Sequence, residues 1–129
     1  MIRVYTASKL HHRQRWVSLR SQWPGVTFTA RWPDLEKDRP SSDDEARSNW
    51  LKDEEDVRKA DVVMVYAEDG EHLRGALIEA GMAIALGKTV LVVGDHPDFG
   101  TWQHHPRVMH AADLDHAHSR LTELAASAD

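Results

Sequence analysis

Two short apolar runs, with an apolar helical stretch between them, dominate the pattern of hydrophobic positions. Val62–Tyr66 and Thr89–Val93 are rich in β-branched residues and do not alternate with polar positions, which is typical of strands covered on both faces of a parallel sheet. Between them, Gly75–Leu86 carries a single charged residue, Glu79, and its apolar residues surround the helical wheel, which predicts a buried helix. A lone carboxylate on a buried helix is costly unless it is paired, is protonated or opens into a cavity. Glu79 is therefore the first candidate functional residue.

The rest of the pattern predicts strands and helices in alternation. Further strands are expected at Ile2–Thr6, Val26–Trp32 and Arg107–His110. Further helices are expected at Leu10–Trp23, from a Ser42 cap to about Lys59, and at Asp113–Ala128. This alternation predicts an α/β fold, in which residues 1–129 form one doubly wound, flavodoxin- or Rossmann-like domain with about five parallel strands and helices on both faces. In such sheets, ligands bind beyond the C-terminal ends of the strands at the topological switch point.

The helix before the first apolar run carries the second candidate carboxylate. Its apolar stripe is expected to contain Ala46, Trp50, Asp53 and Val57. Asp53 then faces inward, while Glu55 and Asp56 point elsewhere. Two inward acids on neighbouring helices can differ in protonation and divide acid and base roles. The alternatives are an Asp53 that only forms hydrogen bonds between helices and a Glu79 that is only ion-paired, for example with Arg74.

Composition and charge narrow the class of protein. The chain has 129 residues, no cysteine and a formal net charge of -5. The length fits one domain, and the negative charge argues against a nucleic-acid polymer as partner. No apolar run approaches the length of a membrane span, and no apolar leader precedes the strand at Ile2–Thr6. We therefore expect a cytoplasmic protein without a membrane partner.

Polar groups at predicted turns are candidates for binding an anion. Ser8 follows the first strand, and Arg74 and Gly75 stand at the start of a helix, where backbone N–H groups favour phosphate. Neither G-x-G-x-x-G nor a Walker A sequence occurs, which argues against a dinucleotide or P-loop site. Among the aromatic residues, Trp32 at the end of a predicted strand and Trp102 in a predicted loop are the better candidates for stacking on a base.

Two pairs of adjacent histidines raise the question of a metal. They are His11-His12 and His104-His105. Adjacent side chains rarely point at one ion, and no H-x-x-x-H pattern is present. The sequence therefore predicts no metal site and no other cofactor.

An ordered set of motifs resembles the nucleoside 2-deoxyribosyltransferase-like superfamily, which includes the 2′-deoxynucleoside 5′-phosphate N-hydrolases. The residues that carry the resemblance are Asp53, Ala60-Asp61, Gly75, Glu79-Ala80-Gly81 and Gly87-Lys88. The resemblance implies cleavage or transfer at the N-glycosidic bond of a (deoxy)nucleoside or its 5′-monophosphate, with Glu79 as the nucleophile. It implies that Asp53 orients the base or the nucleophile and helps to protonate the leaving base, and that Tyr5, Ser8 and Trp32 line the site. It also implies a homodimer or a higher homo-oligomer, in contact through the second and third helices.

One departure from the family's pattern keeps other functions open. Members usually have a second glycine two residues before the glutamate, where this chain has Leu77. The alternatives are a catalytically silent nucleotide-binding or sensing module on the same fold, and a structural or partner-binding domain. The sequence also leaves hydrolysis and transfer undecided.

Overall fold

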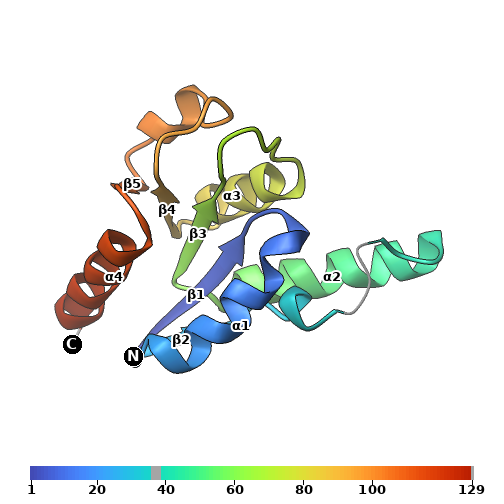
Figure 1. The fold of residues 1–129 in the computed structure, drawn as a ribbon, viewed down its shortest axis with the longest axis horizontal. Coiled ribbons are helices and arrows are strands. Elements are labelled where there is room, and N and C mark those ends of the chain that lie inside the picture. The colour runs from blue at the N-terminus through green and yellow to red at the C-terminus, as the bar shows by residue number, and fades with distance from the viewer. Residues whose placement is uncertain (36–38, 129) are drawn as a thin grey trace.

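A computed structural model describes residues 1–35 and 39–128 and shows one parallel sheet. Within this part of the chain the strands are β1 (Ile2–Ala7), β2 (Val26–Phe28), β3 (Val62–Tyr66), β4 (Thr89–Val93) and β5 (Val108–Ala111). Their order across the sheet is β2-β1-β3-β4-β5, and every neighbouring pair is parallel (Figure 1). Residues of β3 and β4 from Val62 to Val65 and from Val90 to Val93 are almost completely buried. This confirms the prediction that these two runs are strands covered on both faces.

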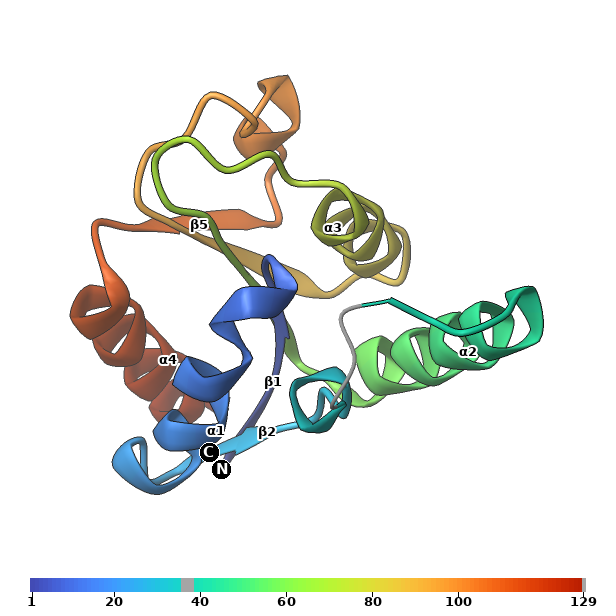
Figure 2. The ribbon, with the colours of Figure 1, turned by 45° about the vertical axis from the view of Figure 1, so that its right-hand side comes forward.

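Helices cover both faces of the sheet. They are α1 (Arg13–Gln22), α2 (Asp43–Lys59), α3 (Gly75–Ala85) and α4 (Leu114–Ala128), with short 3-10 helices η1 (Leu10–His12), η2 (Trp32–Asp34) and η3 (Thr101–His104). Figure 2 shows α1 and α4 on one side of the strands and α2 and α3 on the other. Trp23, at the end of α1, stacks on His118 of α4 with ring centroids 4.8 Å apart. The doubly wound α/β fold is therefore confirmed.

The strand order places the switch point between β1 and β3. The chain leaves β1 toward β2 at one edge and leaves β3 toward β4 in the opposite direction. In flavodoxin-like sheets with this order, the crevice at the C-terminal ends of these two strands is the ligand site. The segments above it are residues 8–12, after β1, and residues 67–74, after β3.

The second strand is shorter than predicted. β2 ends at Phe28, and Trp32 lies in η2 rather than in a strand. Arg31 donates its backbone N–H to the Asp56 carboxylate (2.9 Å), and Pro33 has no N–H to give to a sheet. These two features turn the chain away from β1 before Trp32.

The register predicted for α2 is only partly right. Ser42 caps the helix as expected, because its Oγ accepts a hydrogen bond from the Glu45 N–H (3.1 Å). Val57 is fully buried and Asp53 is half-buried, but Trp50 is 39% exposed. Asp56, which the stripe places outside, is 1% exposed. Figure 1 shows that the N-terminal half of α2 projects beyond the sheet.

The prediction that α3 is buried on all sides is wrong. Its sheet-facing side buries Ala76, Glu79, Ala80 and Ala83, and these mostly small residues allow close packing on the strands. Its outer side leaves Ile78 55% exposed and Leu86 39% exposed.

Like the other described helices, α3 lacks the combination of length and apolar composition that a transmembrane span requires.

Candidate active site

Glu79 lies on the buried side of α3, directly above β1. Its side chain accepts a hydrogen bond from the Tyr5 hydroxyl, and Tyr5 is itself fully buried on β1. Within residues 1–35 and 39–128 Glu79 forms no ion pair, with Arg74 or with any other basic side chain. Burial raises the pKa of Glu79 to about 8, the nearby Asp53 charge adds to this rise, and the Tyr5 hydrogen bond opposes it. The residue is therefore a buried carboxyl that holds a proton at neutral pH.

Asp53 lies on α2, across the Tyr5 hydroxyl from Glu79. Burial raises the pKa of Asp53 to about 6, the Asp56 charge raises it further, and Arg31 and a hydrogen bond with Tyr5 lower it. Burial and the charges of Glu79 and Asp53 also raise the pKa of Tyr5, so its phenol stays protonated. Between pH 6 and 8 the two carboxyls together hold about one proton. The structure thus brings the two candidate acids into one group, joined by a tyrosine hydroxyl.

A cavity of about 780 Å³ opens over this group. Its walls come from the loop after β1, from η2, from the N-terminal half of α2 and from the start of α3. Both Glu79 and Asp53 line it, whereas the buried Tyr5 lies behind Glu79. The volume is in the range of pockets that hold a small organic ligand. Because its walls include the loop after β1, the cavity lies at the switch point that the strand order defines.

Ser8 and Trp32 line the cavity, and both are held by hydrogen bonds. The Ser8 Oγ accepts a hydrogen bond from the Trp16 indole N–H (2.8 Å) and donates one to the Lys9 carbonyl (3.0 Å). The Trp32 indole N–H donates to the Thr6 carbonyl at the end of β1 (2.8 Å). These bonds fix the two side chains as rigid parts of the wall.

Arg74 and Gly75 line the opposite wall, where α3 begins. In the described part of the chain, no hydrogen bond or ion pair of the Arg74 side chain is found, and the residue is exposed. A Cβ at Gly75 would lie 3.5 Å from the Trp50 ring, so the indole covers the start of α3. A cationic side chain beside a helix N-terminus favours a phosphate.

Trp50 is an aromatic lining residue that the sequence interpretation did not assign to the site. It was assigned to the core, but it lines the cavity beside Asn49 and Asp53. Its position three residues before Asp53 on the same helix was the available signal, because residues three apart share a face. Trp102 does not line the cavity, because it packs in η3 against Phe99 with ring centroids 6.0 Å apart.

The raised pKa of Glu79 predicts how stability depends on pH. We expect Glu79→Gln to gain stability relative to the wild type as the pH rises from about 4.5 to about 8. In that window the folded wild-type protein binds more protons at Glu79 than the unfolded chain does, so its free energy of unfolding falls with rising pH. The glutamine still accepts the Tyr5 hydrogen bond but has no charge to bury. Melting temperatures of both proteins across this range test the prediction, and a difference that does not change with pH would contradict it.

The fold and the site together define an α/β domain of flavodoxin-like strand order, with a buried pair of carboxyls beneath a cavity at its switch point. No protein-family model and no curated protein matches the sequence. Among solved structures, the chain is similar to the CMP N-glycosidase BcmB of Clostridium botulinum, with a TM-score of 0.58 and 16% identity over 95% of this chain and 98% of that one. A similarity at this level of identity shows that the two proteins share a fold along almost their whole length.

Proposed function

We propose that the chain cleaves the N-glycosidic bond of a nucleoside 5′-monophosphate or nucleoside, with Glu79 as the nucleophile. The observation that carries this proposal is a buried carboxyl at the switch point that lines a cavity and has a tyrosine hydroxyl, not a cation, as its partner. The shared fold with a CMP N-glycosidase supports the reaction type, and the motifs that resemble the nucleoside 2-deoxyribosyltransferase-like superfamily include both Glu79 and Asp53.

The two carboxyls divide the chemistry as they do in retaining glycosidases. Tyr5 contacts both carboxyls; when its hydroxyl turns to donate its proton to Asp53 and takes the proton of Glu79, Glu79 is left ionised and Asp53 protonated. Glu79 then attacks C1′, the bond from C1′ to the base nitrogen breaks, and Asp53 gives its proton to the departing base. Water next attacks C1′, releases the Glu79 carboxylate and returns a proton to Asp53. The products are the free base and the sugar or sugar phosphate.

The walls of the cavity favour a nucleotide over a nucleoside. Trp32 and Trp50 offer aromatic surfaces to a base. Arg74 and the N-terminus of α3 offer a cation and backbone N–H groups to a 5′-phosphate. CMP is the first substrate to test, because it is the substrate named for the structural neighbour.

Release of free base tests the proposal directly. The protein is incubated with CMP, dCMP, cytidine and the other common nucleosides and monophosphates, and free base is separated by chromatography. We expect base release from at least one monophosphate. An added acceptor base distinguishes transfer from hydrolysis, since transfer yields a new nucleoside. The absence of base release across the panel would overturn the proposal.

A catalytically silent nucleotide-binding module is the second candidate. The specific observation in its favour is that the pKa of Glu79 is raised to about 8, so that the carboxyl is protonated in the empty site. A silent module shows a rise in melting temperature with one of the nucleotides but releases no base from it.

Self-association through α2 and α3 is a separate proposal. Ile78 on α3 and Leu51 on α2 are 55% and 61% exposed, and burial of such side chains between copies removes apolar surface from water. We expect the mass of a dimer or larger assembly by light scattering at micromolar concentration. Ile78→Glu is expected to shift the mass toward the monomer, and a wild-type protein that is already monomeric contradicts the proposal.

A further inference from the structure

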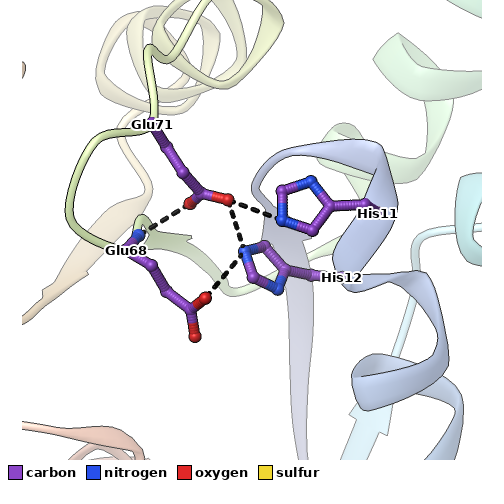
Figure 3. Close-up of side chains that lie close together, drawn as sticks. All are labelled: His11, His12, Glu68 and Glu71. Carbon is purple, nitrogen blue, oxygen red and sulfur yellow. Dashed lines mark hydrogen bonds and ion pairs between the residues drawn. The ribbon is translucent and has the colours of Figure 1, made fainter.

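A second cluster of ionisable side chains lies beside the cavity and plays no part in the proposed reaction. Figure 3 shows His11 and His12 of η1 facing Glu68 and Glu71 of the loop between β3 and α3. The four ligand atoms, one from each side chain, all lie within 4.8 Å of one another. We propose that this cluster binds one divalent transition-metal ion, of which Zn²⁺ is the representative.

Both imidazoles point at one carboxylate oxygen. The Nε2 atoms of His11 and His12 lie 2.7 and 2.8 Å from Oε2 of Glu71, and Nε2 of His12 lies 3.8 Å from Oε1 of Glu68. Four ligands at the usual Zn–N and Zn–O lengths are about 3.3 Å apart in a tetrahedron. To accept an ion, the closest pairs of ligand atoms would have to move apart by about 0.5 Å and the most distant pairs would have to move together. Small rotations of the side chains provide these movements.

The two carboxylates are already oriented for this role. Oε1 of Glu71 accepts the Glu68 backbone N–H (2.7 Å), which leaves Oε2 for the imidazoles. Oε2 of Glu68 accepts hydrogen bonds from the Tyr66 hydroxyl (2.5 Å) and from Arg15 (3.1 Å), which leaves Oε1 toward His12. Contacts that hold the outer atoms of ligands in this way are typical of metal sites, because they fix ligand orientation.

Burial and charge add to the geometry. His12 is 5% exposed, and the Glu71 side chain is 11% exposed. Two neutral imidazoles and two carboxylates carry a charge of about -2, which a divalent ion neutralises. Nitrogen and oxygen ligands in equal number suit zinc and its neighbours, whereas Mg²⁺ prefers oxygen ligands and retains its water. Coordination uses the Nε2 lone pair, so the ring hydrogen of each histidine then sits on Nδ1.

The ion would join the two loops that frame the cavity. His11 itself lines the cavity, and the β3–α3 loop that carries Glu68 and Glu71 ends at Arg74. A bound ion fastens that loop to η1, and so fixes the wall that carries Arg74. This role is structural and independent of the proposed reaction at Glu79.

Direct metal binding tests the proposal. Protein without a polyhistidine tag is treated with EDTA, dialysed and titrated with Zn²⁺ and, separately, with Mg²⁺ by calorimetry and equilibrium dialysis. We expect one Zn²⁺ per chain with a rise in melting temperature, and no saturable binding of Mg²⁺. His11→Ala and Glu71→Gln are each expected to weaken Zn²⁺ binding by at least ~10-fold.

The second histidine pair supplies the matched control. His104 is exposed and lies in η3, outside the cluster, so His104→Ala is expected to bind Zn²⁺ as the wild type does. The His11 side chain is 62% exposed, so its loss is expected to leave the fold intact, and circular dichroism of the variant checks this. The proposal is overturned if the wild type shows no saturable Zn²⁺ binding, or if His11→Ala and Glu71→Gln bind the ion as tightly as His104→Ala.

Discussion

Glu79→Gln is expected to abolish base release from the substrate that the panel identifies. An amide has no negative oxygen to attack C1′, so the glycosyl-enzyme intermediate cannot form. Loss of a covalent nucleophile costs on the order of 10⁴–10⁶-fold in turnover. Base release is measured by chromatography under single-turnover conditions, with the variant and the wild type at equal concentration.

The folding of this variant separates the catalytic role from an ion-pair role. Because Glu79 has Tyr5 as its partner, the glutamine side chain keeps the hydrogen bond, and the variant stays folded and still binds nucleotide. Glu123→Gln is the control, since Glu123 is exposed on α4 and its substitution leaves turnover unchanged. A Glu79→Gln variant that turns over normally, or one that unfolds, contradicts the proposed nucleophile.

The fold was predictable because its apolar pattern is strong. The runs of β3 and β4 are continuous and short, which distinguishes strands covered on both faces from helices. The rule that crossover connections are short and right-handed predicts the strand order, and with it the switch point, only in outline. The edge strand β2 was overextended, because the sequence does not show that Asp56 binds the backbone of Arg31.

The candidate site was predictable in its carboxylates but not in its contacts. Glu79 stood out because it is the one charge on an apolar helix. Its hydrogen bond with Tyr5 joins residues 74 positions apart, and the cluster of His12 with Glu71 joins residues 59 apart. Such pairs depend on how β1, the loop after β3 and α3 meet in space, and no local pattern encodes them. For the same reason the sequence does not show that the adjacent His11 and His12 side chains converge on one oxygen of Glu71.

The register of α2 illustrates a limit of the single-stripe argument. At 100° per residue, Asp56 lies about 60° from Asp53 on one side, and Val57 lies about 40° from it on the other. A helix that packs against both β1 and a neighbouring segment buries a wider arc than one stripe. Arg31 supplies the counter-charge, because the Nε and Nη2 atoms of its guanidinium each lie 3.0 Å from Oδ1 of Asp56. The buried acid is therefore a paired one, and this corrects the expectation that Asp56 points away.

We expect the two substitutions to impair different properties: Asp53→Asn lowers turnover, and Asp56→Asn lowers stability. Asp53→Asn keeps the shape of the side chain but removes the proton that goes to the leaving base. Loss of a positioned acid costs ~10²–10⁴-fold in turnover, with little change in the melting temperature. Glu54→Gln, a neighbouring acid that pairs with Arg58 at 3.1 Å on the surface, is the control and keeps full turnover.

Asp56→Asn is expected to lower the melting temperature, because it removes the negative charge that pairs with the Arg31 guanidinium and replaces the carboxylate that accepts the Arg31 backbone N–H with a weaker, neutral acceptor. Arg31 precedes Trp32, so the loss also loosens that part of the cavity wall and raises KM more than it lowers kcat. Turnover at saturating substrate separates the two variants, since only Asp53→Asn removes a group from the chemical step. If Asp56→Asn is the variant that loses kcat while Asp53→Asn is normal, the acid of the reaction is not Asp53.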